Sequence, residues 1–264
     1  MAERPAPRWR QSGSLWCLNP VDGPPRGLLE FIGGSYLAAT PQISYGRLLE
    51  TLARRGWQVH AWSYVPGFDH QLQANQAWRD FRQHRPERPP SAARSTHGAG
   101  AVDQPVLRLG HSLGCKLHLL APDGGRGCDG LVALAFNNFS AERSVPLLAE
   151  AGERFGFRSE FSPSPAETLR LAASHYRQPR SLLVRFLRDS LDQSSRLLAS
   201  LKQRPGDASS LLELPGDHLT PASAGLRRRV LGDWADDPSR QRQIALLCER
   251  IEHWWSASAA QPQS

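Results

Sequence analysis

The sequence has few cysteines, and no two of them are spaced as a metal-binding or redox pair. Its 264 residues include four, at positions Cys17, Cys115, Cys128 and Cys248. The lack of a C-x-x-C pair argues against a zinc site, and so small a number fits a reducing compartment better than secretion. We therefore expect a cytoplasmic protein that needs no metal ion or other cofactor.

Long hydrophobic runs are also absent. No apolar run approaches the roughly 18 residues that a membrane-spanning helix needs. The first residues, MAERPAPRWRQSG, are positively charged but contain no apolar stretch, so they do not form a secretory signal. The sequence predicts no transmembrane segment and no cleaved leader.

Lysine is almost missing, although the chain is basic. Lys116 and Lys202 are the two lysines, and arginine supplies the rest of the 32 basic residues in a chain of net charge +7. The arginines are scattered, only 227–229 form a run, and no nucleic-acid-binding module is recognisable. We expect no nucleic-acid partner. The charge is compatible with peripheral contact with an anionic membrane and with a lipid-derived substrate. Nothing in the sequence indicates an oligomeric state.

Strand and helix patterns alternate along most of the chain. This alternation predicts one α/β domain over residues 14–255, between loose tails at 1–13 and 256–264. Near-continuous apolar strands such as 130–136 favour a mainly parallel sheet covered by helices on both faces. The expected strands are 14–18, 27–32, 57–64, 106–109, 130–136, 181–186 and 210–214, and the main expected helices are 41–55, 71–83, 115–120, 194–203 and 237–255.

Two segments interrupt the alternation. Residues 84–103 are poor in aliphatic side chains and rich in Pro, Ala, Ser and Gly, which predicts a flexible surface insertion. Residues 141–178 show helical but no strand patterns until the next strand begins. One helix there has a marked start, with Ser164 as N-cap, Pro165 at the first position and Glu167 at the third. We expect this segment to form a small helical cap.

The stretch around which the chain is organised is PVLRLGHSLGCKLHLL, residues 105–120. A strand pattern meets G-x-S-x-G and a helix pattern follows, which is the layout of a nucleophile elbow. Gly110 and Gly114 flank Ser112 because so tight a turn leaves no room for side chains. The pattern alone occurs by chance in about one chain in ten of this length. His111 is the variable position, and we expect it to pack or orient locally.

The residues that would complete a catalytic triad follow in the order found in α/β-hydrolases: nucleophile, acid, histidine. A serine hydroxyl needs a base to take its proton, and the base needs a third group to fix its tautomer. His218 follows the strand at 210–214 and is the candidate base. Asp189 and Asp192 both follow the strand at 181–186. Asp189 is nearer the strand end, whereas Asp192 could instead cap the next helix.

Acyl transfer also requires donors for the developing oxyanion. The N–H of Leu113, directly after the nucleophile, is one candidate. The second is expected in the loop after an early strand, where the sequence reads Gly33-Gly34-Ser35-Tyr36. We predict that the Ser35 N–H fills this role. The alternative is an ordinary glycine-rich strand-to-helix turn. No GK[ST] follows, so the loop is not a phosphate loop.

Several segments together resemble one uncharacterised family. They are GHSLGCKLHLL, LAFNNFS, FSPSPAETL, LLVRFLRDSLDQS and PGDHLTP, and the resemblance extends over residues 14–255. The family comprises α/β-hydrolase-like proteins of cyanobacteria and plastids, known as a domain of unknown function. The resemblance implies the α/β-hydrolase fold and a cytoplasmic or, in plant relatives, stromal setting. It implies no substrate. Arg108 inside the elbow strand and the 84–103 insertion depart from the expected pattern.

Two classes of function remain open from the sequence. The first is a serine hydrolase, of esterase, lipase or thioesterase type, that acts on a carboxylic ester or thioester through Ser112, His218 and Asp189 or Asp192. An acyltransferase using the same triad is a variant of it. The second is a non-catalytic binding or assembly protein that keeps the fold, because a fold does not establish an activity.

Overall fold

A single eight-stranded sheet organises the chain. The computed structural model describes residues 7–85, 104–140, 160–222 and 238–259. The strand order is β1-β2-β4-β3-β5-β6-β7-β8. From β4 to β8 all neighbours pair in parallel, and β1 and β2 join antiparallel at one edge. The strands are β1 (Arg10–Ser12), β2 (Leu15–Leu18), β3 (Gly27–Ile32), β4 (Trp57–Trp62), β5 (Val106–His111), β6 (Gly130–Leu134), β7 (Ser181–Phe186) and β8 (Ser210–Leu214). The predicted mainly parallel sheet is confirmed.

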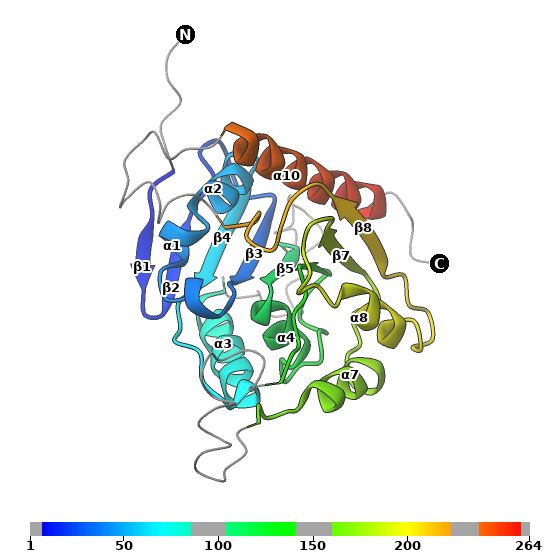
Figure 1. The fold of residues 1–264 in the computed structure, drawn as a ribbon. Coiled ribbons are helices and arrows are strands. Elements are labelled where there is room, and N and C mark those ends of the chain that lie inside the picture. The colour runs from blue at the N-terminus through cyan, green and yellow to red at the C-terminus, as the bar shows by residue number, and fades with distance from the viewer. Residues whose placement is uncertain (1–6, 86–103, 141–159, 223–237, 260–264) are drawn as a thin grey trace, which may run out of the picture.

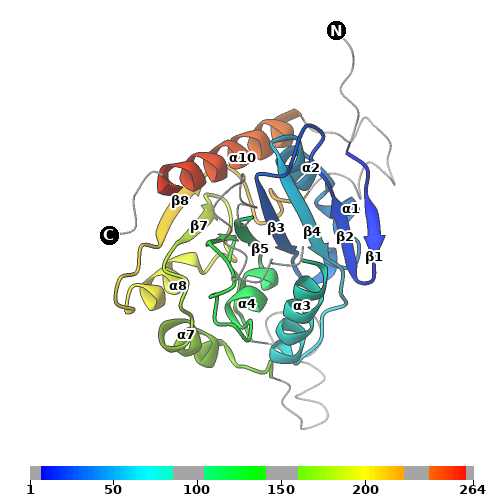
Figure 2. The ribbon, with the colours of Figure 1, turned by 180° about the vertical axis from the view of Figure 1, so that it is seen from behind.

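Helices cover both faces of the sheet, as Figures 1 and 2 show. On one face lie α2 (Gly46–Arg54), preceded by the short α1 (Pro41–Ser44), and α10 (Pro238–Ala259). On the other face lie α3 (His70–His84), α4 (Leu113–Leu119), α7 (Pro165–Ser174) and α8 (Ser194–Leu201). Successive strand residues point to opposite faces, so Leu29 and Phe31 pack with α2 and α10 in one core cluster, whereas Ile32 packs with α3 and α4 in another.

The parallel strands bring their carboxyl ends to one edge of the sheet, where functional sites of such folds collect. β3 leads there into the 3₁₀ turn Ser35–Leu37, and β5 leads into α4. The segments that follow β7 and β8 contain Asp189 and His218. The topology therefore brings together residues that are up to about two hundred positions apart in sequence.

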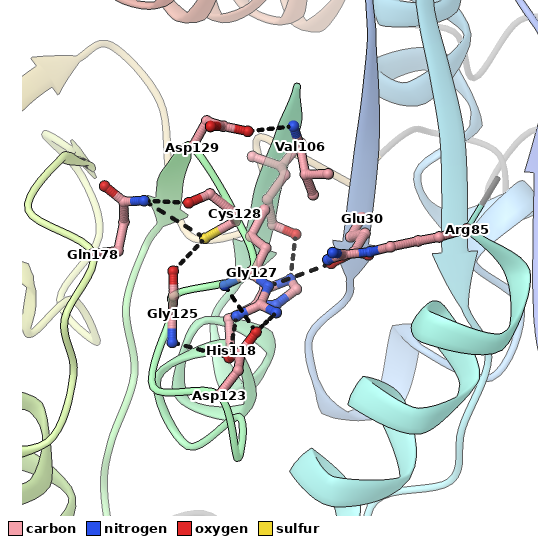
Figure 3. A network of polar contacts seen from close by, with 12 residues as sticks. Glu30, Arg85, Val106, His118, Asp123, Gly125, Gly127, Cys128, Asp129 and Gln178 are labelled. Carbon is pink, nitrogen blue, oxygen red and sulfur yellow. Dashed lines mark hydrogen bonds and ion pairs between the residues drawn. The ribbon is translucent and has the colours of Figure 1, made fainter. Parts of the chain in front are cut away.

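Arg108, unexpected in an apolar strand, belongs to a buried ionic network with Glu30 and Asp123, two residues that Figure 3 labels. It is 2% exposed and lies beside the fully buried Glu30 of β3, with Nε 3.3 Å from Glu30 Oε2. Its other nitrogens form two bonds to Asp123, of 2.9 and 2.6 Å. Burial raises the pKa of Asp123, but the bonds from Arg108 outweigh it and hold that pKa at about 2. Glu30 also accepts a 2.7 Å bond from Arg85. The charge on the strand is thus matched by partners distant in sequence.

Regular secondary structure begins earlier and ends later than the sequence predicts. Residues 10–12 of the expected loose tail form β1, which pairs with β2. The last helix continues to Ala259, so part of the expected tail at 256–264 is helical. His84, expected to begin the insertion, is the last residue of α3. The rest of the insertion from residue 86 lies outside the described residues.

Two expectations about helices are also corrected. The single helix expected over 41–55 is divided at Tyr45 into α1 and α2. The apolar Leu72 is predicted from the sequence to lie on the buried side of the helix expected over 71–83. It is 48% exposed, and the buried side is formed by His70, Gln73, Ala74, Ala77 and Phe81. The other predicted helices and strands agree with the structure to within a few residues at their ends.

The expected cap falls partly on residues 141–159, which lie outside the described residues. In the remainder, Ser164 accepts a hydrogen bond from Glu167 N and caps α7, as predicted. Ala172 and Tyr176 pack with α4, α8 and the sheet in one core cluster. This part of the expected cap therefore belongs to the helical layer over the sheet. Among the described helices none is long and apolar enough to cross a membrane.

Candidate active site

Ser112 occupies a strained turn between β5 and α4. Its φ of 53° and ψ of −118° lie outside the regions that residues with a side chain ordinarily adopt. A Cβ on Gly110 would come within 2.6 Å of Cys115 N, and a Cβ on Gly114 would fall on the carbonyl oxygen of Ile32. The glycines at both positions therefore allow the turn to form and to pack against β3.

Ser112, His218 and Asp189 are connected by two hydrogen bonds. Ser112 Oγ lies 3.1 Å from His218 Nε2, and His218 Nδ1 lies 2.8 Å from Asp189 Oδ2. Ser112 is 8% exposed, and the side chain of His218 is 18% exposed while that of Asp189 is fully buried. The three side chains form one hydrogen-bonded row in which the histidine side chain is the most exposed.

The hydrogen-bond partners fix the tautomer of His218. Asp189 Oδ1 accepts a 2.9 Å bond from Leu191 N, which leaves Oδ2 to accept from His218. Burial raises the pKa of Asp189, but the bond from His218 and its attraction outweigh this effect, so the pKa lies below its usual range. A carboxylate accepts only, so Nδ1 bears the proton and Nε2 is free to accept from Ser112.

The second candidate acid, Asp192, has different partners. Its two oxygens accept from Ser194 N at 2.9 Å and Ser194 Oγ at 2.8 Å, at the start of α8. Its pKa is raised, chiefly by burial. Asp217, beside the histidine, accepts from Leu219 N and stabilises the turn. Geometry therefore groups Asp189, and neither of the other two carboxylates, with His218.

The predicted oxyanion loop lies directly against the elbow. A Cβ on Gly34 would lie 3.1 Å from both His111 Nδ1 and Ser112 Cβ. Gly34 N donates to the hydroxyl of Tyr45, so it is already occupied. Ser35 begins a 3₁₀ turn and Leu113 begins α4, and a first helical residue has no intrahelical acceptor for its N–H. Both predicted donors thus begin helical turns next to the serine.

The sequence does not indicate that Tyr45 lies at the site, and it indicates the role of the neighbouring His111 only in part. The Tyr45 hydroxyl lies 2.8 Å from His111 Nδ1, and His111 Nε2 lies 2.8 Å from the carbonyl oxygen of His218. The sequence predicts only that His111 packs or orients locally, and it places Tyr45 inside a continuous helix. No pattern in a single sequence indicates that the two meet.

The described residues contain no group of three or more His, Cys, Asp or Glu side chains arranged to hold a metal ion.

A protein-family model described as "Protein of unknown function (DUF1350)" matches residues 8–236. The chain belongs to this family. None of the curated proteins matches the chain. Membership agrees with the resemblance seen in the sequence segments and assigns no activity to the DUF1350 chain.

Solved structures similar to this DUF1350 chain are α/β-hydrolases. Est1E from Butyrivibrio proteoclasticus has a TM-score of 0.56 and 13% identity, covering 97% of this chain and 100% of that one. A thermophilic esterase from Thermogutta terrifontis has a TM-score of 0.53 and 18% identity, and the match covers 99% of this chain and 98% of that one. The thioesterase domain of the curacin biosynthetic pathway has a TM-score of 0.51 and 14% identity, and the match covers 85% of this chain and 97% of that one. At such identities the likeness establishes the α/β-hydrolase fold, which confirms the predicted fold class.

Proposed function

We propose that this protein is a serine hydrolase that cleaves a carboxylic ester or thioester. The observation that carries the proposal is the continuous row from Ser112 Oγ through His218 to Asp189, with bonds of 3.1 and 2.8 Å. A serine in a strained turn at the head of a helix, beside a histidine in the right tautomer, is what nucleophilic acyl transfer needs.

The reaction follows from these positions. Ser112 Oγ attacks the acyl carbon while its proton passes to His218 Nε2, and the carboxylate of Asp189 stabilises the resulting imidazolium. The oxyanion accepts hydrogen bonds from Ser35 N–H and Leu113 N–H. The tetrahedral intermediate collapses to an acyl-serine as His218 returns the proton to the leaving alcohol or thiol. Water then repeats the sequence and releases the acid.

Exposed apolar side chains favour an apolar acyl group. Large exposed hydrophobic residues are a feature of binding surfaces when they cluster. In the described part of the chain such residues follow β4, β7 and β8, whose carboxyl ends share the edge with Ser112. They are Val65, Phe68, Leu72, Leu187, Leu191 and Leu219. We infer a medium-chain or long-chain acyl substrate.

The decisive experiment is covalent labelling with a fluorophosphonate probe, which reports an activated serine without knowledge of the substrate. We expect labelling of the wild-type protein and loss of labelling in Ser112→Ala and His218→Ala. The matched control is Ser194→Ala, because the Ser194 hydroxyl donates to the carboxylate of Asp192 and not to a histidine. Labelling that persists without Ser112, or no labelling of the folded wild-type protein, would refute the proposal and favour a non-catalytic binding role.

The acyl preference is tested separately with p-nitrophenyl esters of increasing chain length. We expect kcat/KM to rise from acetate to octanoate, because each buried methylene contributes about 0.8 kcal/mol. A constant or falling series would contradict the inferred substrate class while leaving the hydrolase proposal in place.

A further inference from the structure

A second row of hydrogen bonds runs behind the nucleophile. Gly34 N donates to Tyr45 Oη at 2.8 Å. Tyr45 Oη lies 2.8 Å from His111 Nδ1, and His111 Nε2 lies 2.8 Å from the carbonyl oxygen of His218. Tyr45 is fully buried and His111 is 1% exposed. In such an environment every polar atom needs its partner, because an unsatisfied buried group is costly.

The partners determine the direction of each bond in this row. A carbonyl oxygen only accepts, so His111 Nε2 must bear the proton, and Nδ1 must then accept. The Tyr45 hydroxyl is the donor to Nδ1, and its oxygen accepts from the Gly34 N–H. The pKa of His111 is lowered to about 3, chiefly by burial and secondly by the nearby His218. The ring is therefore neutral and keeps donating across the pH range in which a catalytic histidine works.

The row joins the three loops that bear the proposed machinery. Gly34 precedes the oxyanion residue Ser35, His111 precedes the nucleophile Ser112, and the last acceptor is the backbone of the base His218. The rings of His111 and His218 are 5.1 Å apart between centroids. These loops follow β3, β5 and β8, and no local sequence interaction fixes their relative positions.

We propose that Tyr45 and His111 form a positioning relay that holds the oxyanion loop and the base loop in register with Ser112. The relay rests on the proposed hydrolase function, since it acts through those three parts. Neither side chain is assigned contact with the substrate. A displacement of about 1 Å in such parts costs up to about a hundredfold in rate, so fixing their relative position has a catalytic effect.

The kinetic test compares variants that break the relay with one that leaves it intact. We expect His111→Leu and Tyr45→Phe to slow probe labelling and kcat roughly tenfold or more, with KM little changed. His111→Gln offers a donor and an acceptor and should restore part of the loss. The control is Tyr64→Phe, because the buried Tyr64 hydroxyl donates to Gly33 O at 3.0 Å in the same loop but does not contact His111.

Coupling separates a relay from two independent structural contacts. Because Tyr45 and His111 act in series, the rate of the double variant should lie within about twofold of the rate of the slower single variant. Tyr64→Phe should combine additively with His111→Leu. Two results would overturn the relay. One is a double variant whose loss of rate is the product of the two single losses, and the other is a loss of rate in Tyr64→Phe as large as in Tyr45→Phe. Circular dichroism and the melting temperature establish that each variant is folded.

A readout independent of activity keeps this inference distinct from the proposed function. Nitrogen-15 NMR of the imidazole rings should show His111 as the Nε2–H tautomer without titration from pH 5 to 8, and Tyr45→Phe should shift its Nδ1 resonance. An Nδ1–H tautomer, or titration in that range, would refute the relay even in an active enzyme. A wild-type protein that neither labels nor turns over would refute the hydrolase and the relay's catalytic role, whereas the NMR result would still decide the hydrogen bonds.

Discussion

Replacement of Asp189 by asparagine tests the assignment of the acid at a single atom. In the wild-type protein Oδ1 accepts from Leu191 N and Oδ2 accepts from His218 Nδ1. Asparagine has one oxygen and one amide donor. If the oxygen stays on Leu191 N, the amide faces Nδ1, which must then accept. The ring proton moves to Nε2, and Nε2 can no longer take the proton of Ser112.

Two energies bound the size of this effect. The wrong tautomer costs up to about 10⁴-fold in rate, as in the serine-protease triad, which is about 5.4 kcal/mol of barrier. The amide can instead rotate and keep its oxygen on His218. That rotation leaves Leu191 N–H facing another donor and costs about 1–3 kcal/mol. The cheaper route limits the loss, so we expect a loss between about fivefold and about 160-fold for Asp189→Asn.

Asp192→Asn is the matched control, three residues further along the same segment. Asp192 contacts Ser194 N and Ser194 Oγ and has no hydrogen bond to His218. The expected result is a loss of about 1 kcal/mol of stability or less, in the range of a helix-start side chain, with a labelling rate within about twofold of wild type. The assay is the second-order rate of fluorophosphonate labelling, with melting temperatures measured in parallel. Equal losses in the two variants, or a larger loss in Asp192→Asn, would refute the assignment of Asp189.

Three further predictions concern the surroundings of the site. Glu30→Gln should destabilise the fold by about 1–3 kcal/mol, because it removes the buried carboxylate that pairs with Arg108 and Arg85 while Arg108 keeps its bonds to Asp123; an unchanged melting temperature would contradict this. Gly34→Ala should reduce labelling at least about tenfold with a small change in melting temperature, because its Cβ would lie 3.1 Å from the nucleophile. Burial lowers the pKa of His118 to about 3. The neutral ring therefore contributes stability to the folded protein above about pH 6.5, and this contribution is lost by about 1.4 kcal/mol per pH unit as the pH falls toward 3. His118→Gln should therefore move acid unfolding to lower pH in circular-dichroism titrations.

The parts of the fold that the sequence predicted are those governed by short-range pattern. The strands 181–186 and 210–214 have the predicted bounds because turn-forming residues follow each apolar run closely, Asp189-Ser190 in one case and Pro215-Gly216 in the other. The start of α7 was predicted because Ser164, Pro165 and Glu167 supply capping chemistry within four positions. Such signals need no knowledge of tertiary contacts.

Sequence pattern is insufficient where a distant partner decides the outcome. Tyr45 interrupts the expected helix and reaches Gly34 N and His111, a contact across 66 positions. Arg108 departs from the apolar pattern of a core strand, and its partner Glu30 cannot be recognised from the sequence because it is 78 positions away. The choice between Asp189 and Asp192 also depended on where the segment after β8 places His218. Periodicity contains none of this information.

The strain at Ser112 explains why so much of the structure converges on one turn. A residue in this backbone region costs of order 1–3 kcal/mol and persists only when its surroundings over-determine it. Ser112 N bonds Leu134 O at 2.9 Å on the neighbouring strand, and Gly114 packs directly on the backbone of β3. Arg108, four residues earlier, fixes β5 to β3 through Glu30. The strained serine is thus held on both sides by neighbouring strands, and its hydroxyl remains 3.1 Å from His218 without rearrangement.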